Sequence, residues 1–518
     1  MENLNTFARK VLMEINPEPE LLEQILHPHG LYDISQSEAM TDFKNRLLQA
    51  KEKGEKILVA GDYDCDGIMS TTIFTEGLKA FGLETGFYIP DRIRQGYGLS
   101  AKTVQMACDK GYSLIITCDN GVKAQEALQK AKELGVDVIV TDHHVRPESV
   151  ECQILVHPDL LEEQFASLCG AGIAFECIRA LGIEQERFMI YAAVASIADC
   201  MEVCGQTREI IQQGLALFNQ KGEMHLDPFV RSKPVCERDI AFQVAPKINA
   251  IGRLADRANV NTFVRYMQST RRSTIEDYAQ KVCAINDLRK RLSEQVYGRS
   301  QLLIHPTRKV LLAADASFHE GIIGLAAGNL CSNYCKPAII CTRSDEGYKG
   351  SMRAPRGFHC LDFLSGFDGF AAIGGHAQAA GFTIKPDRFA DFETYVFEQA
   401  SSYKWELEPE PVIEIEPSEI NTANIHALDA LRPFGSGFEL PKFAVKNPPI
   451  ISKFDLSGGT HRKFQLANGI EALNFNQSET DARMDYHAID EIIGTLSLSS
   501  FRGRQRADFI IDEVIYKE

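Results

Sequence analysis

The chain has 518 residues, more than one hydrophobic core usually organises, so its length favours two to four domains. Hydrophobic residues make up 44% and charged residues 24% of the chain, which is ordinary for a globular protein, and no apolar run approaches the roughly 20 residues of a membrane helix. The net charge of -16 argues against a general nucleic-acid binder, although bound cations would neutralise acidic groups and a local basic stripe can exist on an acidic protein.

After a lead-in over residues 1–50, the segment 51–260 alternates strand-like and helix-like patterns. Its apolar runs lie at 57–60, 86–89, 114–116, 138–140 and 154–156. Helix-like segments, such as 68–81 and 124–134, lie between them. This alternation predicts an α/β domain with a parallel sheet and crossover helices.

Three further units follow along the chain. Residues 261–305 are rich in charge and contain no proline and a single glycine, which predicts a long connecting helix. Residues 306–402 predict a second α/β domain, with strands near 310–313 and 338–340. Short alternating strands with turn signals in 403–518 predict a small all-β barrel after a linker at 406–411.

The fourteen cysteines are scattered, and none forms a Cys-x-x-Cys pair. Such cysteines are typical of small buried side chains in a reducing compartment. The first residues lack the basic start and apolar core of a secretory signal. We therefore predict a cytoplasmic protein.

Acidic and imidazole side chains follow several of the predicted strands. Asp62, Asp64 and Asp66 follow the run 57–60, and Asp119 follows 114–116. His143 and His144 follow 138–140, whereas Asp199 follows a helical segment. The first triplet resembles the opening of a calcium-binding EF-hand loop, but Ile73 stands where that loop needs a glutamate.

The carboxyl ends of parallel strands meet at one edge of a sheet, where ligands bind in open α/β folds. Mixed carboxylate and imidazole ligands suit Mn²⁺, and Mg²⁺ where carboxylates dominate. The pattern predicts a hydrolytic site with two ions held about 3.5–4 Å apart.

A second group of residues is suited to phosphate. Gly374 and Gly375 would let backbone N–H groups approach an anion, with His376 as a further donor, although such a triplet is more often a turn. Arg353 could pair with an oxygen-rich group. Tyr97 lies between glycines and is interpreted equally well as a base-stacking ring or as a tyrosine buried under its loop.

The succession DYDCDG, CDNG, TDHH and a later AD resembles the DHH phosphoesterase superfamily, and within it the RecJ family of single-strand-specific 5′→3′ exonucleases. The resemblance extends from about residue 50 to 518. It is also carried by IPDR at 89–92, GYG at 96–98, CGAGIAF at 169–175, PKINAIGR at 246–253, HEGIIG at 319–324, GSMR at 350–353, GGHAQAAG at 374–381, RPFG at 432–435 and SFRGR at 500–504.

The resemblance implies the fold and the roles of individual residues. The fold would be a DHH domain, the connecting helix, a DHH-associated domain and an OB-type barrel. Asp62 and Asp64 would hold one metal, Asp66, His143 and Asp199 the second, Asp119 would bridge them, and His144 would contact the scissile phosphate. The implied substrate contacts are Arg92, Tyr97, Asn249, Arg253, Ser351, Arg353, Gly374, Gly375 and His376. For Arg253, a helix cap or an inter-domain salt bridge is the alternative.

The implied activity is 5′→3′ hydrolysis of single-stranded DNA in recombination and repair, with a single-strand-binding protein and a helicase as partners and no membrane. One alternative is a DHH-family phosphodiesterase of short oligonucleotides or cyclic dinucleotides, although such enzymes usually lack a C-terminal barrel. The other is a non-catalytic single-strand DNA-binding scaffold, against which the full set of ligand residues argues.

Overall fold

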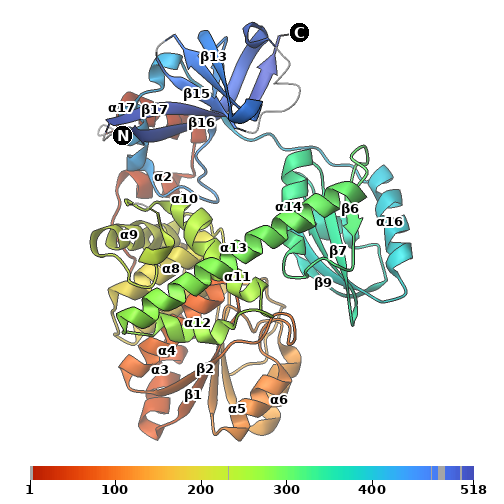
Figure 1. The fold of residues 1–518 in the computed structure, drawn as a ribbon. Helices are drawn as coiled ribbons and strands as arrows, with labels where there is room; N and C mark the ends of the chain where they lie inside the picture. The colour runs from red at the N-terminus through yellow and green to blue at the C-terminus, as the bar shows by residue number, and fades with distance from the viewer. Residues whose placement is uncertain (1–3, 232, 468, 476–484, 502–503, 518) are drawn as a thin grey trace.

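The computed structural model describes residues 4–231, 233–467, 469–475, 485–501 and 504–517. In this part of the chain three sheets form three units, two of which are joined by a long helix (Figure 1). Arg502 and Gly503, within the segment that resembles the RecJ barrel, lie outside the described residues. No helix in the described ranges has the length and apolar character that crossing a membrane requires.

The first unit has a five-stranded parallel sheet in the order β2-β1-β3-β4-β5, as predicted. Its strands are β1 (Lys56–Ala60), β2 (Glu84–Tyr88), β3 (Leu114–Cys118), β4 (Asp137–Thr141) and β5 (Ile154–Val156). The chain passes from β1 to β2 on one side and later returns to β3 on the other. This switch in strand order opens a crevice at the carboxyl edge of the sheet, where the acidic motifs lie.

Helices surround this sheet, and α3, α4, α6 and α7 contact it directly. The helices of the unit are α3 (Glu38–Lys53), α4 (Cys65–Phe81), α5 (Ala101–Asp109), α6 (Gln125–Leu134), α7 (Gly170–Ala180), α8 (Glu186–Ala198), α9 (Gly205–Lys221), α10 (Glu237–Asp239), α11 (Ala245–Arg253) and α12 (Val260–Met267). Most of α4 is buried, because it packs against α7 and α8 as well as the sheet. Its first turn, which carries Asp66, is therefore held on several sides.

The connecting helix α13 (Arg272–Leu303) is 32 residues long and runs from the first unit to the second (Figure 1). It begins later than the predicted residue 261, because α12 ends at Met267 and Arg271 is extended. Ser269 and Thr270 lie in this break, and their side chains compete with the backbone for hydrogen bonds.

The second unit has a mixed sheet in the order β6-β7-β8-β10-β9. Its elements are β6 (Leu311–Ala314), α14 (Ile323–Tyr334), β7 (Ala338–Ser344), β8 (Gly347–Arg353), α15 (Cys360–Leu364), β9 (Phe370–Gly375), β10 (Ala379–Ile384) and α16 (Phe389–Ser402). The glycine-rich motif thus ends the edge strand β9 and faces the first unit. This second α/β unit agrees with the prediction.

The third unit is an OB-type sheet in the order β11-β12-β16-β17-β15-β14-β13. Its elements are β11 (Val412–Glu414), α17 (Thr422–Ala427), β12 (Lys442–Lys446), β13 (Ile450–Leu456), β14 (His461–Leu466), β15 (Glu471–Asn474), β16 (Ile489–Phe501) and β17 (Arg504–Tyr516). The all-β prediction for this region is confirmed.

The first fifty residues divide between two units, which the sequence analysis did not foresee. The helices α1 (Thr6–Ile15) and α2 (Pro19–Leu26) pack on the third unit, where Phe7 and Leu12 share a core with Phe443 (Figure 1). Helix α3 instead places Phe43 in the core of the first unit. The N-terminal segment therefore ties the two ends of the chain together.

Candidate metal centre and substrate cleft

The acidic loop after β1 is fixed by the helices around it. Asp64 is the N-cap of α4, and its Oδ1 accepts a hydrogen bond from the Gly67 N–H at 3.0 Å. The carboxylate of Asp66 accepts hydrogen bonds from the Gly170 and Ala171 N–H groups, both at 2.7 Å. A Cβ on Gly170 would lie 2.6 Å from the Asp119 Cβ, so only glycine permits this approach of α7.

Asp119 lies directly after β3 in the left-handed region, with a φ of 61°. Its Oδ1 is 3.1 Å from the His143 Nε2, and its carbonyl accepts a hydrogen bond from the Tyr97 hydroxyl at 2.8 Å. A non-glycine residue held in this region is typical of a functional site.

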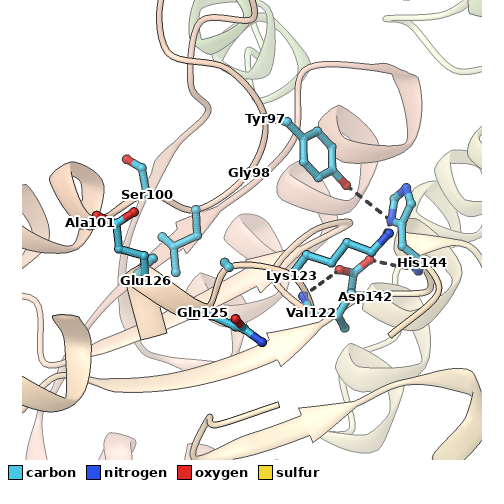
Figure 2. Close-up of a pocket in the computed structure, with 14 residues that line it drawn as sticks. Tyr97, Gly98, Ser100, Ala101, Val122, Lys123, Gln125, Glu126, Asp142 and His144 are labelled. Atoms are coloured by element: carbon cyan, nitrogen blue, oxygen red, sulfur yellow. Dashed lines mark hydrogen bonds and ion pairs between the residues drawn. The ribbon is translucent and has the colours of Figure 1, made fainter. Parts of the chain in front are cut away.

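Asp142 organises the two histidines, although it is not among the site residues predicted from the sequence. It accepts backbone hydrogen bonds from Val122 at 3.1 Å, His143 at 2.8 Å and His144 at 3.2 Å. Its Oδ1 also lies 2.8 Å from the His144 Nδ1 (Figure 2). The sequence feature that could have identified Asp142 is its position at the end of β4, directly before the two histidines.

The predicted ligands converge at one place. Three sets of ligand atoms each lie within 4.8 Å of one another: Asp62, Asp64 and Asp119; Asp66, His143 and Asp199; Asp119, His143 and His144. Asp199 is the C-cap of α8, and its Oδ2 lies 3.4 Å from the His143 Nε2. The site therefore contains two acidic groupings that meet at Asp119 and His143.

The electrostatics of this cluster suit cations. Burial and the neighbouring carboxylates raise the pKa of Asp66 to about 6 and that of Asp199 to about 8. The pKa of Asp62 and of Asp119 is raised for the same reasons. Burial, together with His144, lowers the pKa of His143 to about 4, so its imidazole is a neutral ligand.

The surroundings of Asp62 also fit a bound cation. Its Oδ1 is buried and has no hydrogen-bond partner among the described residues. A buried charged oxygen without a partner is costly, and a divalent cation would satisfy it. The donor set thus fits the two ions that the sequence predicts.

A cleft of about 690 Å³ between the first and second units adjoins this cluster, and Tyr63 and His144 line its near side. Its walls include the predicted residues Arg92, Tyr97, Arg253, Ser351, Arg353, Gly374, Gly375 and His376. Asn249 is placed differently, because its Oδ1 accepts a hydrogen bond from the Cys65 N–H at 2.7 Å and so braces the acidic loop.

The cleft concentrates positive charge on an acidic protein. Burial, with Arg92 and Arg353 nearby, lowers the pKa of Arg253 to about 9. Arg353 also has a lowered pKa, mainly through burial, and it donates a hydrogen bond to the Ser351 Oγ at 3.1 Å. Guanidinium groups that lower one another's pKa would be stabilised by an anion between them.

Tyr97 combines features of the two predicted roles, a ring that stacks on a base and a tyrosine held under its loop. Its side chain is 51% exposed, while its hydroxyl is fixed on Asp119. The ring packs edge-on against Tyr63, which in turn lies under the guanidinium of Arg92. A ring face is therefore available in the cleft.

Comparisons with known proteins agree with this architecture. Models of the DHH family N-terminal domain, the DHHA1 domain and the RecJ OB domain match residues 56–203, 307–402 and 413–513.

Among curated proteins, the chain is 29% identical to a single-stranded-DNA-specific exonuclease RecJ of Bacillus subtilis, over 94% of this chain and 64% of that protein. It thus spans somewhat less than two thirds of that relative. The RecJ of Haemophilus influenzae is 27% identical over 95% of this chain and 92% of its own length.

Solved structures are similar as well. RecJ of Thermus thermophilus in complex with Mn²⁺ has a TM-score of 0.84 at 24% identity, covering 99% of this chain and 78% of that one, and shows the shared fold. An exonuclease RecJ bound to manganese has a TM-score of 0.64 at 27% identity, over 72% of this chain and 97% of that one. The chain therefore contains, in this order, a DHH domain, a DHHA1 domain and a RecJ OB domain.

Proposed function

We propose that the protein is a metal-dependent exonuclease that hydrolyses single-stranded DNA from its 5′ end, in DNA repair and recombination. The main support is that the acidic cluster adjoins, through His144, a cleft lined by arginines from the first and second units. Curated relatives named single-stranded-DNA-specific exonucleases share this domain set over most of the chain.

In this proposal Asp62 and Asp64 hold one Mn²⁺ or Mg²⁺ ion, Asp66, His143 and Asp199 hold the other, and Asp119 lies between both. The grouping of their ligand atoms supports this division. Similar structures are described as complexes with Mn²⁺ and with Mg²⁺. Such ions activate water and stabilise the charge of a phosphoryl transition state.

The chain's own side chains would hold the strand. His144, oriented by Asp142, faces the cleft and donates to the scissile phosphate. Arg92, Arg253 and Arg353 neutralise phosphate oxygens, with the backbone of Gly374 and Gly375 and the side chains of Ser351 and His376 around them. Tyr97 offers its ring to a base. Asn249 does not contact the strand in this proposal and instead holds the acidic loop in place.

We also propose that the protein works in the cytoplasm, where a helicase and a single-strand-binding protein supply unwound DNA. The OB-type sheet favours a long strand over a dinucleotide as substrate, because folds of this kind bind single strands. The domain limits at residues 50, 260, 305 and 402 belong to the same proposal.

The test is nucleotide release from DNA labelled at the 5′ or the 3′ end, as single strand or blunt duplex, with Mn²⁺. We expect mononucleotides first from the 5′ end of single strands. Release first from the 3′ end would contradict the polarity, and equal rates on duplex would contradict the strand specificity. Cleavage of dinucleotides alone would identify a short-oligonucleotide phosphodiesterase, and binding without cleavage a scaffold.

A further inference from the structure

A second cavity, of about 460 Å³, adjoins the cleft and shares Tyr97, Lys123 and His144 with it. Its volume is within the range of small-molecule sites. The cavity lies between residues 97–101, which lead into α5, and residues 121–127, which lead into α6, with Asp142 and His144 at one end (Figure 2). The proposed function names no ligand for this cavity.

This cavity is built from the same contacts that hold the metal centre. Asn120, next to Asp119, accepts a hydrogen bond from the Leu99 N–H at 3.0 Å and donates to the Ala60 carbonyl at 3.1 Å. Val122 donates to the Asp142 Oδ2 at 3.1 Å. Both loops are therefore anchored to catalytic-site neighbours, and the cavity keeps a fixed position relative to the acidic cluster.

Lys123 stands where the cavity and the cleft meet. With Tyr97 and His144, it lines both. It is exposed, and no hydrogen-bond or ion-pair partner is found for its ammonium within the part of the chain that the structure describes. It is close enough to His376 of the second unit to contribute to the lowered pKa of that imidazole, after burial and His144.

The lining of the cavity separates an apolar wall from a polar rim. Leu99, Val122 and Ala127 give the wall, and Ser100 and Gln125 give groups that can hydrogen-bond. Glu126 also lines it and would repel a phosphate, so the anion belongs at the Lys123 end. A nucleoside, with an apolar ring face and polar edges, matches this division.

A phosphodiester cleaved inside a strand has a nucleoside on each side of the scissile phosphate. The cleft can receive one side. We propose that the 460 Å³ cavity receives the nucleoside on the other side, and that Lys123 binds a phosphate oxygen of the strand at the junction. This inference rests on the proposed exonuclease activity and adds to it a second subsite and a further substrate-binding residue.

The test of Lys123 uses Lys123→Gln, Lys123→Arg and, as a matched control, Lys102→Gln, an exposed lysine of α5 that lines neither cavity. Steady-state rates are measured on a 5′-phosphorylated single strand with Mn²⁺ between about 50 and 200 mM salt. We expect Lys123→Gln to lower kcat/KM about tenfold, as expected for loss of a charged hydrogen bond. The slope of log kcat/KM against log salt should become shallower by about 0.7, the value for one phosphate contact.

Lys123→Arg should restore both the rate and the salt dependence, and Lys102→Gln should match the wild type. A salt dependence of Lys123→Gln identical to that of Lys102→Gln would overturn the phosphate contact. Because the wild type is assayed in parallel, absence of cleavage by the wild type would instead refute the proposed function itself.

The test of the cavity fills it with Ala101→Leu, with Ala101→Ser as the control of similar size. Substrates carry an abasic sugar at one of the first three positions. We expect Ala101→Leu to lower kcat/KM at least fivefold on the intact strand, and this loss to disappear for the one abasic position whose base would enter the cavity. An equal loss at every position, or no loss, would overturn the subsite.

Discussion

At the scale of single residues, the site contains two kinds of buried carboxylate. One kind is surrounded by hydrogen-bond donors, and the other by further carboxylates. Asp142 is buried yet satisfied by three backbone N–H groups and the His144 ring, and its pKa is lowered by His144 in spite of burial. Asp62 and Asp119 are buried among other carboxylates, and their pKa is raised. Asp142 is thus a structural anion, whereas Asp62 and Asp119 have the surroundings that suit the proposed metal ligands.

Replacing Asp142 by asparagine should impair catalysis through His144. Burial lowers the pKa of His144, but the hydrogen bond and the charge of Asp142 raise it above its ordinary value, and the amide removes that charge. We expect kcat to fall about 10–100-fold, the usual effect of losing a partner that orients an active-site group. The limb of the pH–rate profile that reports His144 should move to lower pH.

The control for this prediction is Asp159→Asn, at an exposed carboxylate that pairs with Arg146 near the same loop. It should leave both kcat and the pH profile unchanged. A profile of Asp142→Asn that does not move would show that Asp142 does not act through His144.

Without metal, the protein should lose stability as the pH rises from 6.5 to 8. The pKa of Asp199 is about 8 in the folded protein because of burial and of Asp66 and Asp64, so only the folded state keeps this proton in that interval. The loss amounts to about 1.5–2 kcal/mol over the whole window, since the folded state also begins to release this proton as the pH approaches 8. Below 6.5 the lowered pKa of His143 acts in the opposite direction, so the prediction is confined to this window.

Thermal unfolding in EDTA should show a Tm about 4 °C or more lower at pH 8 than at pH 6.5, given a shift of about 2–4 °C per kcal/mol. Saturating Mn²⁺ should remove most of the slope, and Asp199→Asn should reduce it in EDTA. A Tm in EDTA that is independent of pH across this window would contradict the raised carboxylate pKa.

At the scale of elements, α1 completes the core of the C-terminal unit although 400 residues separate them. The Phe7 side chain is 3% exposed, and its ring centroid lies 5.9 Å from that of Phe443. We expect Phe7→Ala to destabilise this unit by about 3–5 kcal/mol. Hydrogen exchange in β16 and β17 should become faster.

Met13 of the same helix provides the control, since its side chain is 63% exposed. Met13→Ala should leave exchange in these strands unchanged. If Phe7→Ala behaves like Met13→Ala, the N-terminal helices do not support the C-terminal sheet.

Elements whose pattern is local could be predicted from the sequence, and those defined by distant contacts could not. The parallel sheet follows from apolar runs such as Ile57–Ala60, which are buried on both faces. The acidic motifs could be placed together because they follow such strands. The docking of α1 was not predictable, because an amphipathic helix does not specify which core it joins. Lys123 was not predicted as a substrate-binding residue, because a single lysine in a loop is not part of any recognisable sequence motif.

At the scale of the whole molecule, the C-terminal unit is fixed to the first unit close to the metal centre. The Arg208 side chain of α9 is 2% exposed and donates hydrogen bonds to the Leu431, Arg432 and Pro433 carbonyls at 2.9–3.0 Å. The Val203 N–H, four residues after Asp199, donates to the Ser436 carbonyl at 2.9 Å. The OB-type sheet is therefore held at a defined position relative to the site.

Arg208→Met should loosen this connection, because it leaves buried carbonyls unpaired at a cost of about 1–3 kcal/mol each. We expect the radius of gyration from small-angle scattering to increase and the KM for long single strands to rise, while dinucleotide cleavage stays the same. Arg265→Met, at an exposed arginine of α12, is the control. An unchanged radius and KM would mean that other contacts suffice.

The proposed function requires the acidic cluster at the edge of the first sheet to bind metal and to cleave single-stranded DNA. The most direct measurement is nucleotide release from a 5′-labelled single strand with Mn²⁺, comparing the wild type with Asp119→Asn. We predict single-strand-selective release by the wild type and a loss of more than about 100-fold in the variant, since even partners of metal ligands contribute 10–100-fold. Equal release by both proteins would contradict the claim, as would wild-type release that persists in excess EDTA.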